Sequence, residues 1–249
     1  MRTLLIDGDI LAYKSASKAE VSIKWEESTI WTYHADEEQA KYLAVSQIES
    51  LKDELNAKKV EIALTDSSNF RKDILPSYKD NRKDKRKPLV LKALREFLIK
   101  EYKAIVYPHL EADDVMGILA TTPTNRAVKQ YIVCSVDKDL KQIPCYLSAN
   151  GRDVVRRDEK ECNRWHLIQT LTGDSVDGYT GCPSIGRVTA DRLLSDVELP
   201  IKDMWSIVVD TYEKNGLGEK DALQQARVAR ILRYGDYDKA TGKVKLWQA

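Results

Sequence analysis

Short apolar runs that end in aspartate alternate with amphipathic stretches, and this alternation constrains the fold of the chain most strongly. The apolar runs cover residues 2–7 (RTLLID), 60–66 (VEIALTD) and 131–137 (YIVCSVD), and runs of this kind are typical of buried parallel strands. Between them, residues 38–57 and 89–102 carry apolar side chains at helical spacing. The pattern predicts an α/β fold in which helices flank a central, mostly parallel sheet.

Near residue 160 the sequence changes from apolar runs to helical patterns, which predicts a second structural region. Residues 1–160 contain the apolar runs and form the expected α/β domain, with a basic arch at about 68–88. Three further helical patterns follow, near residues 184–195, 201–214 and 219–233. We therefore expect residues 161–249 to form a mostly helical region.

Acidic side chains gather at one edge of the predicted sheet, because the carboxyl ends of parallel strands meet there. The three apolar runs end in or lead into aspartates, LEADDVMG opens a helix after another apolar run, and GDSVDG adds a further pair. The nine candidates are Asp7, Asp66, Glu111, Asp113, Asp114, Asp137, Asp139, Asp174 and Asp177. Taken singly, each group is also compatible with a helix cap or a turn, where Asp is common.

So many carboxylates at one place would repel one another strongly unless cations neutralised them. Oxygen ligands without His or Cys select hard ions such as Mg²⁺ or Mn²⁺, and the number of acids suits two ions about 3.5 to 4 Å apart. Such a pair activates water and stabilises the departing oxygen of a phosphodiester, which is nuclease chemistry. A structural Ca²⁺ site would more usually gather its ligands within one loop, and the EF-hand pattern is absent from the sequence.

A strongly basic segment, which we call the basic strap, covers residues 71–87. It holds eight Lys or Arg residues and three Asp residues, whereas the whole chain has a net charge of only +1. Because it follows an acid-tipped run, we expect it to arch over the metal site. Arg71 and Lys83 would contact DNA phosphates there, and Tyr78 would offer a stacking surface. On charge alone, a solvated surface loop is equally compatible.

A second phosphate-binding element is predicted in GCPSIGRVTADRLL (residues 181–194). Gly181 and Gly186 flank a short turn that contains Ser184 and leads through Arg187 into a predicted helix. Backbone N–H groups in such a turn can approach a phosphate closely, as in helix-hairpin-helix motifs. Two glycines before a helix are also common in ordinary loops, so the position directly after GDSVDG is what favours DNA binding.

Five motifs, read in order, connect the chain to a known family. They are IDGD, FRKDILPSYKDNR, LEADDVMG, CSVDKDLKQIP and GDSVDGYTGCPSIG. The chain resembles the 5′-nuclease superfamily, which includes flap endonucleases and the 5′-nuclease domains of bacterial DNA polymerases. It is most similar to the 5′-to-3′ exonucleases of short-tailed bacteriophages, whose C-terminus resembles ARILRYGDYD and LWQA here. The resemblance implies a PIN-like 5′-nuclease fold with a helix-hairpin-helix (H3TH) C-terminal region.

The resemblance also implies roles for individual residues. All nine acids would hold a pair of Mg²⁺ or Mn²⁺ ions, and Lys79 and Arg82 would meet the phosphate that is cut, with Tyr78 beside them. The glycine hairpin would grip duplex DNA with a K⁺ ion, although Ser184 stands where many relatives have glycine. The implied activity is cleavage of double-stranded or branched DNA, and of RNA in RNA–DNA hybrids, in phage replication, primer removal or recombination.

The same sequence indicates where the protein acts. Its four cysteines are scattered without a Cys-x-x-Cys pair, and it has neither a signal peptide nor an apolar run of about 18 residues. We expect a monomer without membrane contact in the cytoplasm, which for a phage protein is that of the bacterial host.

Two alternative functions stay open at this point. LLIDGDI also resembles the Asp-x-Asp nucleophile strand of haloacid-dehalogenase phosphatases, although we interpret Asp9 as a neighbour of the metal shell or a helix cap. The other alternative is a branched-DNA binding module that does not cleave. Assays with small phosphomonoesters and with DNA distinguish these functions.

Overall fold

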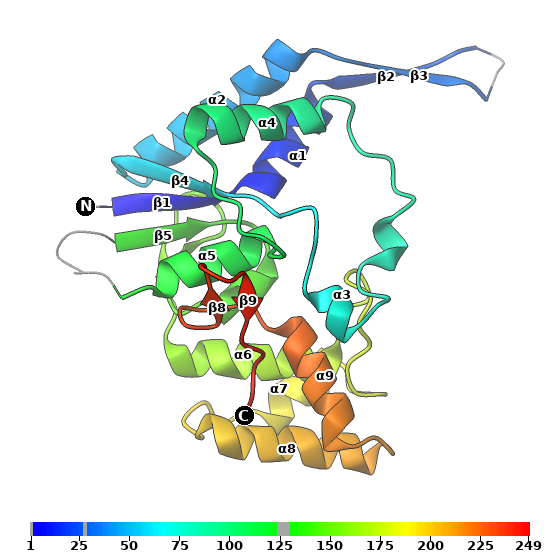
Figure 1. Cartoon of the computed structure of the whole chain (residues 1–249), viewed down its shortest axis with the longest axis vertical. Coiled ribbons are helices and arrows are strands. Elements are labelled where there is room, and N and C mark those ends of the chain that lie inside the picture. The colour runs from blue at the N-terminus through cyan, green and yellow to red at the C-terminus, as the bar shows by residue number, and fades with distance from the viewer. Residues whose placement is uncertain (1, 27–28, 124–129) are drawn as a thin grey trace.

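The computed structural model of the chain describes residues 2–26, 29–123 and 130–249. Its main sheet has the strand order β4-β1-β5-β6-β7 (Figure 1). The strands are β1 (Arg2–Asp7), β4 (Lys59–Ala63), β5 (Gln130–Cys134), β6 (Tyr146–Ser148) and β7 (Val155–Arg156). The first four run parallel and β7 is antiparallel, so the predicted mostly parallel sheet is confirmed. The apolar run before LEADDVMG contributes only an isolated bridge between Ile105 and Ala63.

Helices cover both faces of the sheet, because successive side chains of β1 point to opposite sides. They are α1 (Gly8–Lys18), α2 (Glu37–Glu54) and α4 (Leu91–Tyr102) on one face and α5 (Ala112–Thr121) on the other (Figure 1). Leu4 and Ile6 are buried against the first three helices, whereas Leu5 is buried with Val115 of α5. The helices predicted from apolar spacing on either side of the strap are therefore confirmed.

The C-terminal helices pack around a core of their own. They are α6 (Glu159–Thr172), α7 (Arg187–Leu193), α8 (Ile201–Lys214) and α9 (Glu219–Ala229). The last predicted helix ends four residues early, because the chain leaves α9 to bury Ile231 and Leu232 beneath α5. There the carbonyl oxygen of Leu232 lies only 2.2 Å from where a side chain at Gly117 would begin, so the glycine permits this close approach. A small ribbon of β8 (Tyr237–Asp238) and β9 (Lys243–Val244) follows.

The basic strap and a β-hairpin lie at the periphery of the main sheet. The basic strap contains only α3 (Arg71–Ile74) and the 3₁₀ turn η1 (Asp80–Arg82), and otherwise consists of turns and extended chain. A two-stranded antiparallel hairpin, β2 (Glu20–Lys24) and β3 (Trp31–Ala35), was not predicted from the sequence and projects from the sheet domain near α1 (Figure 1). Among the described residues, no helix is long and apolar enough to span a bilayer.

Candidate active site

Asp7 lies at the carboxyl end of β1, an interior strand of the sheet between β4 and β5. One of its carboxylate oxygens accepts the N–H of Ile10 at 3.0 Å and caps α1, while the other accepts the hydroxyl of Ser135 at 3.1 Å. Ser135 directly follows the neighbouring strand β5. Gly8 lets the turn after Asp7 pack closely, since a Cβ there would lie 2.6 Å from the carbonyl oxygen of Ala63. The motif IDGD thus fixes a buried carboxylate at the edge of the sheet.

Asp137 precedes the 3₁₀ turn η2 (Lys138–Gln142), just beyond β5, and Asp139 lies within it. Asp137 caps this turn by accepting the N–H of Asp139 at 2.8 Å. The side-chain amide of Gln169 on α6 donates to Asp139 at 2.7 Å. The helical region therefore orients an acid of the sheet domain.

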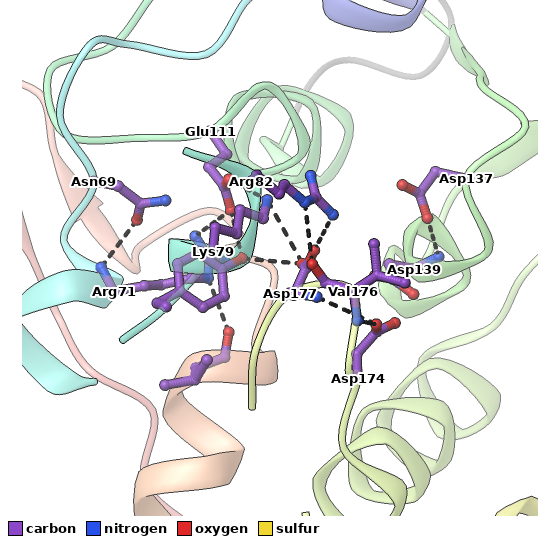
Figure 2. A network of polar contacts seen from close by, with 12 residues as sticks. Asn69, Arg71, Lys79, Arg82, Glu111, Asp137, Asp139, Asp174, Val176 and Asp177 are labelled. Carbon is purple, nitrogen blue, oxygen red and sulfur yellow. Dashed lines mark hydrogen bonds and ion pairs between the residues drawn. The ribbon is translucent and has the colours of Figure 1, made fainter. Parts of the chain in front are cut away.

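Glu111 precedes α5 and meets two residues of the basic strap (Figure 2). The Tyr78 hydroxyl lies within hydrogen-bonding distance of Glu111 (2.9 Å) and of Asp177 (3.1 Å). Lys79 forms an ion pair with Glu111, and its ammonium nitrogen lies 3.6 Å from Asp177. Its backbone is left-handed (φ 58°), and its N–H donates to the Asp177 carbonyl at 2.8 Å. Several contacts thus hold Lys79 in a backbone conformation that a non-glycine residue seldom adopts.

The GDSVDG loop brings two more acids from beyond α6. Asp174 accepts the N–H of Val176 at 2.8 Å, and the ammonium of Lys138 lies 3.0 Å from its second oxygen. Arg82 of the strap forms an ion pair with Asp177 and donates through Nε to the Val176 carbonyl at 3.1 Å. Figure 2 shows the strap and this loop meeting over the Glu111 side of the site.

The acids of this region raise one another's pKa values. Burial raises the pKa of Asp113 well above its usual range, and the charges of Asp7, Asp137 and Glu111 raise it further. Burial, followed by the charge of Asp137, raises the pKa of Asp139 to about 7. We call the acids linked by such effects and by the contacts above the carboxylate cluster: Asp7, Glu111, Asp113, Asp137, Asp139, Asp174 and Asp177.

Glu111 differs from its neighbours because the strap supplies positive charge to it. Burial alone would raise its pKa, but Lys79 and then Arg71 outweigh burial and lower it to about 2. One side of the cluster is therefore neutralised by protein cations, whereas Asp113 and Asp139 are left with an excess of negative charge.

Asp114 lies behind the cluster and is fully buried. Its two oxygens accept a bidentate pair of hydrogen bonds from Arg71, at 2.6 and 2.8 Å. It also accepts the backbone N–H groups of Leu232 (3.0 Å) and Glu111 (3.2 Å). Arg71 in turn donates to the Val228 carbonyl at 2.8 Å. This geometry favours a positioning role for Asp114, which joins the strap, α5 and the segment after α9.

The carboxylate of Asp66 also accepts hydrogen bonds from other parts of the protein. It accepts the hydroxyl of Ser68 at 2.6 Å and the N–H of His109 at 2.9 Å. The hydrogen bond from Ser68 is the main cause that lowers its pKa to about 2. Asp66 thus fastens the loop that enters the strap to the turn that precedes α5.

Two strap residues expected to face DNA are buried, and these expectations are corrected. Tyr78 is only 2% exposed, because its hydroxyl is used between Glu111 and Asp177, so it offers no stacking surface. Arg71 is 3% exposed because it pairs with Asp114. The side chains of Arg82 and Lys83, by contrast, are 41% and 61% exposed.

The donor chemistry of the carboxylate cluster fits hard divalent cations. It offers only carboxylate oxygens, and its excess of negative charge is what bound cations would neutralise. Within residues 2–26, 29–123 and 130–249, no three His, Cys or acidic side chains are already close enough together to enclose an ion.

The glycine hairpin has the backbone geometry expected of a tight turn. Gly181 (φ 67°) and Ser184 (φ 62°) are both left-handed, and Gly186 caps α7 with open space around its Cα. Arg187 is ion-paired with Asp191, and its guanidinium lies 4.0 Å from the centre of the Trp165 ring. The hairpin therefore presents one cationic side chain at its exit.

Several residues that organise the site were not singled out in the sequence. Ser135 and Lys138 lie inside the motif CSVDKD, so the motif itself was a signal for them. Gln169 had no local signal, because it lies 30 residues from Asp139 in the chain. Asp9, the residue shared with the phosphatase pattern, forms an ion pair with Arg95 of α4.

Comparisons with known proteins identify the family of the chain. A family model described as the N-terminal resolvase-like domain of 5′-3′ exonucleases matches residues 2–162. The exodeoxyribonuclease of Enterobacteria phage T3 is 32% identical over 279 residues, which cover 98% of this chain and 92% of that protein. The exonuclease of Escherichia phage T7 is 32% identical over 282 residues, covering 98% of this chain and 93% of the relative.

A solved structure shares the fold at low sequence identity. It is the bacteriophage T5 flap endonuclease in a pseudo-enzyme-product complex with DNA and metal ions. It superposes with a TM-score of 0.63 at 15% identity, over 92% of this chain and 89% of that one. Neither the phosphatase nor the non-catalytic alternative is supported. The family model, the two phage relatives and the shared fold together show that this chain is a nuclease of the 5′-3′ exonuclease family.

Proposed function

We propose that the chain is a metal-dependent 5′-to-3′ exodeoxyribonuclease that hydrolyses phosphodiesters of double-stranded or branched DNA, with RNA–DNA hybrids as a second substrate. The carboxylate cluster at the sheet edge, bordered by Lys79 and Arg82, is the observation that carries the proposal. We further propose that it acts as a monomer in the cytoplasm of a bacterial host, in phage replication, primer removal or recombination. The phage origin of the two relatives supports this setting.

We propose that the carboxylate cluster holds two Mg²⁺ or Mn²⁺ ions, because hard ions prefer oxygen ligands and the cluster lacks counter-charge. When bound, such ions activate water and stabilise the departing oxygen. Asp7 and Asp113 would hold them from the sheet side, and Asp137 and Asp139 from η2. Ser135 and Gln169 keep these carboxylates oriented through their hydrogen bonds to Asp7 and Asp139.

Lys79 and Arg82 are proposed to contact the phosphate that is cut. Both already lie at the border of the cluster through their ion pairs with Glu111 and Asp177. A positive charge fixed there stabilises the negative charge that builds up on the phosphate in the transition state. We assign positioning roles to Asp114 and Asp66, since other parts of the protein use their oxygens.

We propose a division of labour in which residues 1–160 supply most of the carboxylate cluster, whereas residues 161–249 hold duplex DNA and add Asp174 and Asp177 to the cluster. The hairpin from Gly181 to Gly186 would bind backbone phosphate, with K⁺ as a proposed partner, and Lys83 would assist from the strap. The left-handed turn and the exposed N-cap of α7 support this.

Replacing Arg187 by Ala should weaken duplex binding and lower its salt dependence by up to about one counterion, because one phosphate contact is lost. The saturated cleavage rate should stay nearly unchanged, since Arg187 lies outside the carboxylate cluster. Binding measured in Ca²⁺ across a salt series, followed by the rate on addition of Mg²⁺, checks both statements. An unchanged salt slope would remove Arg187 from the duplex-binding surface.

A duplex labelled separately at each 5′ and each 3′ end tests the proposed function. In Mg²⁺ we expect the 5′ labels to be released first and the 3′ labels to remain until late, and EDTA should stop all release. Early loss of the 3′ labels, or cleavage that continues in EDTA, would contradict the proposed direction or the proposed chemistry.

A further inference from the structure

The β2–β3 hairpin carries two chemically different faces. Residues directly opposite in an antiparallel pair share a face, and the register pairs Lys24 with Trp31 and Ser22 with Tyr33. We call the face formed by Lys24, Trp31 and Tyr33 the aromatic face. The opposite face pairs the aliphatic Val21 and Ile23 with His34 and Thr32.

The aromatic face is open to solvent, yet cations lie over its rings. Trp31 is 49% exposed and Tyr33 is 39% exposed. The ammonium of Lys24 lies 5.8 Å from the centre of the Trp31 ring, and the guanidinium of Arg86 lies 3.8 Å from the centre of the Tyr33 ring. Aromatic rings interleaved with cations are the composition of surfaces that bind single-stranded nucleic acid, where bases stack and phosphates pair.

The hairpin is joined to the basic strap, so this face continues the surface that leads to the active site. Glu20 at the base of β2 pairs with Arg86 and accepts the N–H of Leu89 at 2.8 Å. Arg86 follows Arg82 by four positions in the chain, and Arg82 is paired with Asp177 of the cluster. Four steps along an extended chain cover at most about 14 Å. The strap can therefore guide a single strand of DNA from the carboxylate cluster to the β2–β3 hairpin.

Local charge favours a nucleic-acid occupant over an apolar protein segment. The part of the strap next to the hairpin, residues 83–87, contains four Lys or Arg and one Asp. On the aromatic face itself, the acid Glu20 is already paired with Arg86. Single-stranded nucleic acid matches this surface, because its phosphates suit the positive charge and its base rings suit the exposed aromatic side chains.

We propose that the aromatic face of the β2–β3 hairpin binds unpaired nucleotides of the DNA substrate, by stacking at least one base on Trp31. The proposal rests on the proposed nuclease function and adds a single-strand binding site to it. It predicts that substrates with a 5′ single-stranded tail bind more tightly than blunt duplexes, and that the hairpin supplies the difference.

The test compares a blunt duplex with the same duplex carrying a 5′ tail of thymidines, by fluorescence anisotropy in Ca²⁺ under conditions that give no cleavage. The variant W31A should lose about tenfold in affinity for the tailed duplex, as for one lost base–aromatic stack. Its affinity for the blunt duplex should not change. The variant W31F keeps a ring and should restore most of the loss.

The variant I23A is the matched control, since Ile23 is similarly exposed (52%) on the opposite face of the same hairpin. It should bind both duplexes like the wild type. If I23A loses as much affinity for the tailed duplex as W31A does, the loss comes from a disturbed hairpin, and stacking on Trp31 is contradicted.

Cross-linking of the wild-type protein provides a measurement that does not depend on folding of a variant. A tail containing 5-iodouracil should cross-link to the tryptic peptide of residues 25–41, which contains Trp31 and Tyr33. Cross-links confined to other peptides, together with a W31A variant that binds the tailed duplex as tightly as the wild type does, would overturn the proposal. If the wild type instead fails to cleave even the blunt duplex in Mg²⁺, the proposed nuclease function fails, and that outcome is distinct from this one.

Discussion

Lys79 is held at the border of the carboxylate cluster by three separate contacts. Its ammonium pairs with Glu111 and lies 3.6 Å from a carboxylate oxygen of Asp177. Its backbone N–H donates a hydrogen bond to the backbone carbonyl of Asp177. Although burial opposes protonation, the charges of Glu111 and Asp177 raise the pKa of Lys79 above its usual value. The residue is therefore a fixed cation at the place where a phosphate would enter.

Replacing Lys79 by Ala should lower the single-turnover cleavage rate by about 10²-fold, as for removal of a preorganised group that stabilises transition-state charge. Affinity for duplex should fall only slightly. For the cleavage rate, the matched control is Lys83→Ala, which should keep the saturated rate. Lys83 lies on the same strap but is exposed and pairs only with Asp80 among the described residues. A large loss of affinity with a normal saturated rate would make Lys79 an ordinary DNA-binding residue.

Asp113 is the residue at which charge crowding should be easiest to measure. Because its neighbours disfavour its ionised form, Asp113→Asn should raise the melting temperature of the metal-free protein. One kcal/mol corresponds to about 2–4 °C for a chain of this size. Mg²⁺ should raise the melting temperature of the wild type and raise that of the variant less.

Thermal melting in EDTA and in Mg²⁺ checks this prediction. Asp210→Asn, which removes an exposed acid of α8, serves as the control and should behave like the wild type. A wild-type melting temperature that is indifferent to divalent ions would count against a preformed ion-binding cluster.

Among the elements, the basic strap depends on one buried ion pair for its position. Arg71 of α3 pairs with Asp114 of α5 and donates to backbone carbonyls at the end of α9 and just beyond it. Three elements that are distant in the sequence thus meet at one guanidinium, and the strap starts from that point.

Arg71→Ala should destabilise the protein by about 3–5 kcal/mol, because it leaves the Asp114 carboxylate buried without a partner cation. The control is Lys72→Ala, the exposed neighbour in the same short helix, which should change the free energy of unfolding by less than about 0.5 kcal/mol. Urea unfolding followed by circular dichroism measures both values. A loss below about 1 kcal/mol for Arg71→Ala would contradict the anchoring role.

The elements also show what periodicity can and cannot predict. Strands β1, β4 and β5 were predicted from continuous apolar runs, whereas helices α2 and α4 were predicted because each has a buried side with apolar residues at helical spacing. The β2–β3 hairpin was not predicted, since it has no buried face and therefore no such pattern. The end of α9 depends on a hydrogen bond between Leu232 and Asp114, which lie 118 residues apart. The burial of Tyr78 likewise depends on distant partners, Glu111 and Asp177.

At the scale of the whole molecule, the site is built where the sheet domain and the helical region meet. Asp7 and Asp137 come from strand ends, whereas Gln169, Asp174 and Asp177 come from α6 and the loop that follows it. The strap crosses between the two parts and pairs with acids of both. Seven of the nine acids that the ordered motifs predicted for this site lie in the carboxylate cluster, whereas Asp66 and Asp114 pair with other protein groups. The sequence alone did not show which acids the protein itself neutralises.

The most direct test of this account is cleavage of a 5′-labelled duplex by Asp139→Asn in Mg²⁺, compared with the wild type and with Asp210→Asn. Asp139 belongs to the cluster and is oriented by Gln169, so its replacement should nearly abolish cleavage while duplex binding in Ca²⁺ and the circular dichroism spectrum are retained. Asp210→Asn should cleave like the wild type. If correctly folded Asp139→Asn kept more than about a tenth of wild-type turnover, the carboxylate cluster would not be the metal-dependent centre that we propose.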